Sequence, residues 1–188
     1  MSASNPPAPL LSVEPATLLL HKPAGMTVEA AIHLLVPGHH WSGDATGIVE
    51  APEHFQRLVP GMPLETAAGG LQVFSQDPRR LRWLREDAIR LEQEFNVEVT
   101  GTMVANGLRF LEHGLSYQGR FLPPTKVSWQ NECRLRFAIK DVRDGQLAYM
   151  CAAVGLTIVA IKRLRIGRVS LAKIPAGEWR YLSASEKL

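Results

Sequence analysis

The sequence predicts an α+β domain whose sheet is mixed and largely antiparallel, with helices packed against it. The first reason is that segments of strand character follow one another directly, as at 126–129 and 134–139, where strict alternation of strands and helices would predict a doubly wound parallel sheet. The second reason is the composition, since 188 residues with 46% hydrophobic and 21% charged side chains suit one domain with a substantial core.

Elements of the first half are recognised as apolar runs that end in proline or glycine. They are a strand at 16–20, a short helix at 28–35, a strand at 71–75 and a helix that begins at Pro78. Pro78 suits the first turn of a helix, and Asp77 before it is the expected cap. We expect Leu81, Leu84, Ala88 and Leu91 to face the core.

The second half of the chain is divided by a break at Leu122-Pro123-Pro124. Its expected elements are a strand at 95–99 and a helix at 103–111 before the break, then strands at 126–129 and 134–139, a buried helix at 146–154 and a long strand or hairpin at 157–171. The strand at 134–139 alternates apolar and polar residues, which predicts one buried face. Gly155 follows the buried helix at a position that favours a helix end.

The remaining composition limits the domain organisation and the environment. We expect residues 1–15 to form a disordered tail and residues 16–188 to form a single domain of two lobes. The N-terminus has neither a basic region nor a long apolar run, so we expect no signal peptide, no membrane segment and no membrane partner. Two cysteines without a CxxC pair fit a reducing compartment, which predicts a cytoplasmic location.

Basic residues gather near the C-terminus, where residues 157–177 contain five lysines and arginines and no acid. On a regular strand Arg163 and Arg165 share one face, opposite Lys162. Two interpretations remain open: a solvated strand edge, or a surface that contacts phosphate groups. The net charge of +3 permits a polyanionic partner without requiring one.

Five stretches, in order along the chain, resemble the RsuA-like branch of the bacterial RNA pseudouridine synthases. LLLHKPAGM at 18–26 is similar to the opening strand and N-K-P-x-G turn of that branch, and LVPGMPLETAAGGLQVFSQD at 58–77 to its catalytic segment P-V-G-R-L-D-x-x-T-x-G-L. The others are LEQEFNVEV at 91–99, the segment 136–155, and KRLRIGRVSLAKIPAGEWRYL around 162–181. The resemblance runs from about residue 16 to the end and implies the pseudouridine synthase catalytic fold, without the S4 RNA-binding domain of many members.

The resemblance also implies a reaction on RNA, with ribosomal RNA the expected partner of a monomeric protein. In the family a uridine is flipped out of the stack, a catalytic aspartate acts as nucleophile, and the base is rejoined through carbon 5. Neither a cofactor nor a metal takes part. The expected function is therefore conversion of uridine to pseudouridine in RNA.

Carried over residue by residue, the resemblance places Glu65 at the position of the catalytic aspartate. Phe95, at the position of a tyrosine that packs on the base, is expected with Gln146 and Met150 to contact the substrate. The expected RNA contacts are Lys22, Arg163, Arg165 and Arg168.

The catalytic segment also departs from the family. Pro63 stands at the position of an arginine, Ala68 at that of a threonine, and Gly145 where a cation would pair with the carboxylate. Because a buried carboxylate without a cation tends to take up a proton, these changes predict a weak or lost activity.

Two other parts of the sequence contain candidate functional residues. Adjacent His39 and His40 lack a third ligand at metal spacing, so no metal site is expected. Asp44 in its glycine-rich loop is a candidate surrogate acid. Three hypotheses share one fold: a synthase with Glu65 as an altered nucleophile, a non-catalytic RNA-binding relative, and a scaffold for a protein partner.

Overall fold

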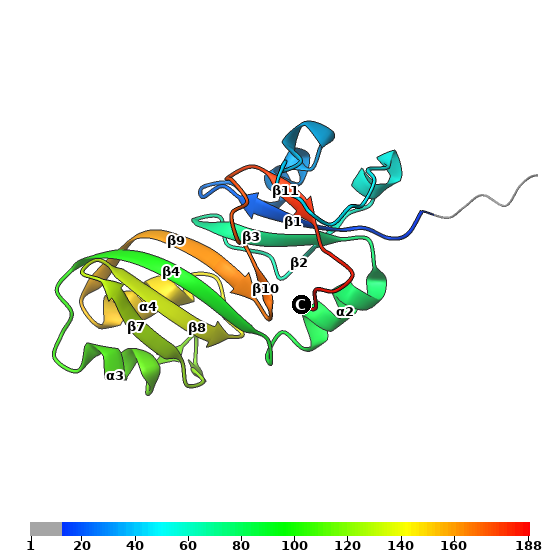
Figure 1. Cartoon of the computed structure of the whole chain (residues 1–188). Coiled ribbons are helices and arrows are strands. Elements are labelled where there is room, and N and C mark those ends of the chain that lie inside the picture. Colours follow the sequence, from blue (N-terminus) through cyan, green and yellow to red (C-terminus); the bar gives the residue numbers. More distant parts are fainter. Residues whose placement is uncertain (1–12) are drawn as a thin grey trace, which may run out of the picture.

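A computed structural model describes residues 13–188 of the chain. Among these residues, nine strands form one sheet with the order β11-β1-β3-β9-β4-β8-β7, and β2 and β10 pair beside β3 and β9 (Figure 1). Within that sheet β3 and β9 run parallel, and the other paired strands run antiparallel. The sheet is therefore mixed and largely antiparallel, as the sequence predicts.

The strands of this sheet have the following bounds. They are β1 (Thr17–Lys22), β2 (Val59–Gly61), β3 (Ala68–Ser75), β4 (Glu92–Gly101), β7 (Lys126–Asn131), β8 (Arg134–Lys140), β9 (Leu156–Ile166), β10 (Val169–Ser170) and β11 (Trp179–Tyr181). A separate small hairpin is formed by β5 (Ser116–Tyr117) and β6 (Arg120–Phe121).

Four α-helices accompany the sheet: α1 (Val28–Ala31), α2 (Pro78–Glu86), α3 (Gly107–Glu112) and α4 (Gln146–Ala153). Three short 3-10 segments, Ile32–Leu34, Pro37–His39 and Pro52–Phe55, lie in the long connection before β2. Asp77 caps α2 by accepting a hydrogen bond from the backbone N–H of Arg79 at 2.9 Å, which confirms the predicted cap.

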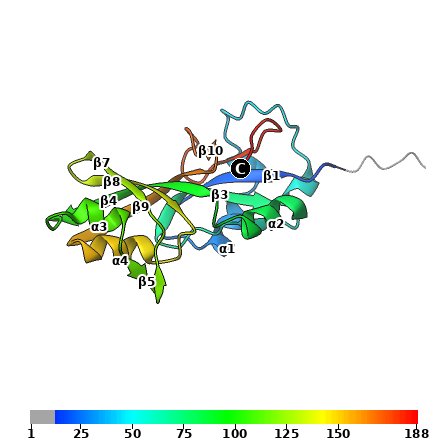
Figure 2. The same ribbon diagram turned by 90° about the horizontal axis from the view of Figure 1, so that it is seen from below.

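Helices α3 and α4 pack on one face of β4, β8 and β9, which we call the inner face (Figure 2). Strand β4 alternates along its length, so Gln93, Phe95 and Val97 are buried on the inner face while Glu92 and Glu94 point to the opposite, outer face. The inner-face side chains join the apolar residues of α4 in one core cluster. Period-two alternation thus gives the sheet one apolar and one charged face.

Two further clusters of buried residues lie around β1 and β3. One contains Trp179 and Tyr181 of β11 with Leu18 and Leu20 of β1, and the other contains residues from β3, β9 and the C-terminal segment. Trp179 is fully buried and donates its indole N–H to the backbone carbonyl of Val36 at 2.9 Å. This contact ties the long connection before β2 to the edge of the sheet.

The predicted elements are confirmed in type, but several bounds differ; β3 and β4 each begin three residues earlier than expected. Helix α2 ends at Glu86, so Ala88 and Leu91 lie beyond it, and α1 gives way to a 3-10 segment at Ile32. Helix α3 begins at Gly107, later than expected, because Asn106 has a left-handed backbone with φ of 61°. The region 157–171 is a hairpin of β9 and β10.

The other expectations about organisation have different outcomes. Of the predicted tail, residues 1–12 lie outside the described residues, and 13–16 have no regular secondary structure. The division into two lobes stays a prediction. Within residues 13–188, no helix is long and apolar enough to cross a membrane.

Candidate active site

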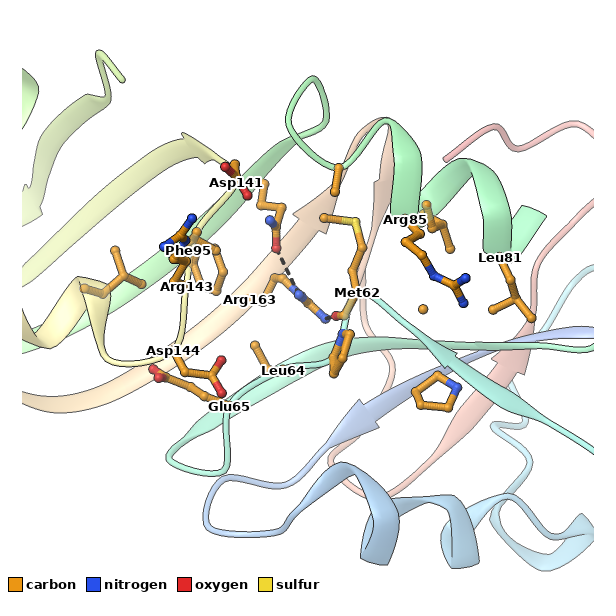
Figure 3. A pocket seen from close by; sticks show the side chains of 18 residues that line it. Met62, Leu64, Glu65, Leu81, Arg85, Phe95, Asp141, Arg143, Asp144 and Arg163 are labelled. Atoms are coloured by element: carbon orange, nitrogen blue, oxygen red, sulfur yellow. Dashed lines mark hydrogen bonds between the residues drawn. The ribbon is translucent and has the colours of Figure 1, made fainter. Parts of the chain in front are cut away.

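A pocket of about 440 Å³ lies where the loop after β2 meets the loop after β8 (Figure 3). Its walls come from residues 60–65, helix α2 with Ala88 after it, strand β4, the loop 141–144, Leu147 of α4 and Arg163 of β9. Glu65, Phe95 and Arg163 all line it, so the fold brings together three of the predicted site residues from distant parts of the chain.

The loop that carries Glu65 is held by a buried glutamine of β3. Gln72 accepts a hydrogen bond from the backbone N–H of Leu64 at 2.9 Å and donates to the carbonyl of Gly61 at 3.0 Å. Leu64 itself is buried against the core. These contacts fix the backbone on both sides of residues 62–63, so Glu65 enters the pocket from an ordered loop.

The carboxylate of Glu65 is bound by a backbone amide. Its Oε2 atom accepts a hydrogen bond from the N–H of Gly145 at 2.7 Å. Across residues 13–188 no lysine or arginine nitrogen lies within 4.0 Å of this carboxylate. The charged form of a carboxylate is favoured by such an amide hydrogen bond, so the site stabilises the anion by a backbone dipole.

Gly145 has no room for the cation that the sequence comparison expects there. Its φ is +76°, and a Cβ atom would lie 2.8 Å from the hydroxyl oxygen of Tyr117. Tyr117 thus occupies the space beside Gly145, and an arginine at this position would be strained. A glycine at this position therefore fits the local packing.

Phe95 is buried, at 2% exposure, and lines the pocket, and its contact with the base stays a prediction. Gln146 and Met150, also expected to contact substrate, are buried and do not line this pocket. Gln146 instead accepts a hydrogen bond from the backbone N–H of Arg143 at 3.1 Å. The prediction for these two residues is corrected: Gln146 binds the loop 141–144, and Met150 belongs to a core cluster.

Lys22 is fully buried, with no exposed surface. Its ammonium donates hydrogen bonds to the carbonyls of Met26 at 2.6 Å and Pro23 at 3.1 Å. Burial lowers the pKa of Lys22 and neighbouring Arg163 lowers it further, while the charge of Glu65 opposes both effects. The prediction that Lys22 contacts RNA is corrected, because the side chain is held inside the fold near Glu65.

Arg163 is also buried, at 2% exposure, and forms part of the pocket wall. Its guanidinium donates to the carbonyls of Leu71 at 2.8 Å and Met62 at 2.9 Å, and to the side chain of Gln93 at 2.9 Å. Burial lowers its pKa to about 9, so it remains charged at pH 7. The prediction of a surface RNA contact is corrected for Arg163, since this cation supports the pocket from within.

Arg165 lies on the outer face, where it pairs with Glu92 at 2.8 Å and Glu94 at 3.2 Å. The register between β4 and β9 shifts at this point, because Phe95 pairs with Arg163 but Glu94 pairs with Arg165. This β-bulge turns the two arginines to opposite faces, so the prediction of a shared face is wrong. Arg168 is exposed in the turn after β9, and its contact with RNA stays a prediction.

Several residues of the site were not predicted from the sequence, among them Gln93, Tyr117 and Asp141. Gln93 precedes Phe95 by two positions, and strand alternation alone predicts that the two share a face. Tyr117 and Asp141 belong to the small hairpin and the loop after β8, and Arg120 of the hairpin pairs with Asp141. Nothing in the local sequence signals that contact, because 21 residues separate the two partners.

Asp44 and His40 form a structural cluster that does not line the pocket. The carboxylate of Asp44 accepts hydrogen bonds from the N–H groups of Thr46 at 2.8 Å and Tyr181 at 2.9 Å, and His40 stacks on Trp179 at 4.3 Å. Hydrogen bonding lowers the pKa of Asp44, against the opposing effect of burial. These contacts favour the structural interpretation of Asp44. Within residues 13–188 no group of three potential ligands could hold a metal ion.

The fold is that of the pseudouridine synthases. A crystal structure of a pseudouridylate synthase matches 92% of this chain and 72% of that chain, with a TM-score of 0.75 and 19% sequence identity. The crystal structure of the archaeal box H/ACA sRNP Nop10-Cbf5 complex matches 82% of this chain and 48% of that chain, with a TM-score of 0.52 and 13% identity.

The sequence is also similar to that of curated RNA pseudouridine synthases. Over 144 residues the chain is 26% identical to the dual-specificity RNA pseudouridine synthases RluF of Escherichia coli (strain K12) and Salmonella typhi, across 77% of this chain and 50% of each relative. The chain therefore spans about half the length of the curated relatives it matches. No family model matches the chain. The chain is thus similar in sequence to RNA pseudouridine synthases and shares the pseudouridine synthase fold.

Proposed function

We propose that this protein binds a uridine flipped out of RNA and converts it slowly to pseudouridine, with Glu65 as the nucleophile. The observation that carries the proposal is the position of the Glu65 carboxylate, which lies in the pocket and is held by the N–H of Gly145 at 2.7 Å. Phe95 offers a ring in the same wall, and the volume of about 440 Å³ lies in the range of small-molecule sites.

The proposed chemistry needs only groups of this chain and the substrate. The carboxylate attacks the nucleotide covalently, the bond between ribose C1′ and uracil N1 breaks, and the detached base turns within the pocket. The bond between the Glu65 carboxylate and C1′ then breaks as C1′ joins C5, the hydrogen of C5 leaves as a proton, and N1 takes up a proton. Atoms and electrons balance without an oxidant, a metal or a cofactor.

A low rate follows from two features of the site. Glutamate carries its carboxylate on a stem one methylene longer than aspartate, and a displacement of roughly 1 Å can cost about 100-fold in rate. Pro63, in the arginine position, supplies no charge in the pocket wall.

Arg85 and Arg143 line the same pocket and are exposed, so we assign them the contact with substrate phosphate.

The RNA partner is inferred from the curated relatives, whose names describe RNA pseudouridine synthases. We propose ribosomal RNA as the substrate class and a monomer in the cytoplasm as the working form. Arg168, exposed beside β9, adds a phosphate contact outside the pocket.

Release of tritium from ribosomal RNA labelled at uridine C5 tests the reaction, because the C5 hydrogen is lost when C5 joins the ribose. We expect slow release by the protein and none by Glu65→Gln, which keeps the shape of the side chain but removes its charge. RNA affinity should stay within about twofold in this variant, because the phosphate contacts remain. Equal release by the protein and by Glu65→Gln would overturn the proposal.

A second candidate is an RNA-binding protein without catalysis. It is favoured by the finding that no cation within residues 13–188 contacts Glu65, since family catalysis is expected to use one. Absence of tritium release together with an RNA affinity that falls steeply with salt concentration would select this candidate. If RNA binding is also undetectable, the third hypothesis, a scaffold for a protein partner, gains support.

A further inference from the structure

The peptide group between Asp144 and Gly145 is hydrogen-bonded at both ends. The hydroxyl of Tyr117 donates to the carbonyl oxygen of Asp144 at 2.9 Å. The N–H of Gly145, the other end of the same peptide, donates to Oε2 of Glu65 at 2.7 Å. A single peptide therefore connects a tyrosine hydroxyl to the carboxylate in the pocket, and its two partners are 52 residues apart in the chain.

The tyrosine side of this connection is anchored by three contacts. Tyr117 lies on β5, and its ring packs against that of Tyr149 of α4, with centroids 5.2 Å apart and an angle of 43° between the planes. The neighbouring strand β6 is tied to the pocket loop, because Arg120 pairs with the carboxylate of Asp141 and also donates to its backbone carbonyl at 3.2 Å. The hydroxyl is thus held against the loop.

Gly145 is the residue that allows both hydrogen bonds to form. Its φ of +76° is a conformation that favours glycine, and a Cβ atom would lie 2.8 Å from the Tyr117 hydroxyl oxygen. Any larger residue would therefore both strain the backbone and displace the tyrosine. The glycine, the tyrosine and the carboxylate fit one another as a set.

Hydrogen bonds in such a chain strengthen each other. A donor on the carbonyl oxygen of a peptide withdraws electron density, so the N–H of that peptide becomes a stronger donor, with an effect of about 10–30% per bond. The bond from Gly145 ends on a carboxylate, and charge-assisted bonds of this length are among the stronger ones in proteins. The tyrosine hydroxyl consequently stabilises and orients the anion without touching it.

We propose that Tyr117 is a positioning residue for Glu65, acting through the Asp144–Gly145 peptide where the family is expected to use a cation. This assignment rests on the proposed function for its effect on rate, but the hydrogen-bond chain is testable without any activity. The same chain holds the carboxylate in a pocket where no lysine or arginine within residues 13–188 contacts it.

The direct test is the amide signal of Gly145 in nuclear magnetic resonance spectra of the intact protein. Glu65→Gln replaces the charged acceptor and sets the direction in which this signal moves when the bond weakens. We expect Tyr117→Phe, which keeps the ring, to move the signal in that same direction. Tyr149→Phe is the matched control, because the Tyr149 ring lies in the same pair and its hydroxyl has no hydrogen bond within the described residues; it should leave the signal in place.

Activity supplies the second readout. Tyr117→Phe should lower kcat by about tenfold with KM unchanged, less than the roughly 100-fold cost of a 1 Å misplacement. A change in KM alone would contradict a role in positioning Glu65.

The outcomes separate the two proposals. If Gly145 responds to Tyr117→Phe but the protein releases no tritium, the hydrogen-bond chain stands and the proposed reaction fails. If the protein is active and Gly145 does not respond, the inference is overturned. Should Tyr117→Phe not fold, Arg120→Gln carries the test, because it releases the hairpin from Asp141; an unmoved Gly145 signal in that variant would equally overturn the inference.

Discussion

Two arginines of β9, Arg163 and Arg165, lie on opposite faces of the sheet and are bound by different kinds of partner. On the inner face Arg163 is buried and donates to neutral oxygens, two of them backbone carbonyls. On the outer face, two residues further along, Arg165 is half-buried and pairs with Glu92 and Glu94. The buried guanidinium of Arg163 is thus bound mainly by backbone carbonyl oxygens. The guanidinium of Arg165 is bound by glutamate side chains, which water can replace.

Each arrangement serves a different part of the molecule. Arg163 joins three segments, since its partners belong to β3, β4 and the loop that carries Glu65. Arg165 belongs to a ladder of charges in which Glu94 also binds Arg136 at 2.7 Å. Loss of the first cation leaves several acceptors buried without donors, while loss of the second exposes acids that water can solvate.

The largest effect is expected where β3 meets the backbone of Arg163. A Cβ atom at Gly70 would lie 2.2 Å from the carbonyl oxygen of Arg163, and the φ of Gly70 is +108°. Gly70→Ala should lower the free energy of unfolding by about 3–5 kcal/mol, from overpacking and backbone strain together. Urea denaturation measures this, with Gly38→Ala as control, because a Cβ there meets nothing within 4 Å. A loss below about 1 kcal/mol would show that β9 can move away from β3.

Arg163→Met should have the next largest effect. It leaves the carbonyls of Leu71 and Met62 and the amide oxygen of Gln93 without their donor, at about 1–3 kcal/mol each. Removal of a buried charge offsets part of this cost, so we expect a net loss of about 2–4 kcal/mol in the free energy of unfolding.

Arg165→Met is the matched change on the outer face. Its expected loss is about 0.5–1 kcal/mol, because exposed ion pairs contribute little. Urea denaturation of both variants under one set of conditions compares the faces directly. Equal losses would show that the burial of Arg163 has no special energetic weight.

The smallest effect concerns the pH dependence of the outer ladder. Arg165 holds the pKa of Glu92 below its ordinary value, and Arg136, with a smaller contribution from Arg165, does the same for Glu94. A carboxyl whose pKa is lowered by folding stabilises the protein above its unfolded pKa and loses that contribution as the pH falls through the folded value.

The stability lost in Arg165→Met should therefore shrink as the pH falls from about 5 toward 3, because protonated acids no longer pair with an arginine. The loss in Arg163→Met should stay constant over this range, since its partners do not titrate. Urea titrations at several pH values measure both. A constant loss in Arg165→Met would mean that the ladder does not stabilise the fold.

The sequence by itself determined most of the architecture. Alternating apolar residues at 135, 137 and 139 predicted β8, Pro78 and Asp77 predicted the start of α2, and the ordered motifs predicted the likeness to pseudouridine synthases and their fold. These features depend on neighbouring residues, whose spacing sets the period and the end of each element. The short strand β11 was missed because its partner β1 lies about 160 residues away.

The tertiary structure alone decided which charges are buried and what holds the carboxylate. Because of a β-bulge, Arg163 lies on the inner face of the sheet and Arg165 on the outer face. The local sequence pattern does not predict this bulge. The Gly145 amide reaches Glu65 across 80 residues, and the Tyr117 hydroxyl fills the space where a cation was expected. Local spacing sets an element and its faces, but hydrogen bonds between distant segments exist only once the chain has packed, and those bonds define this site.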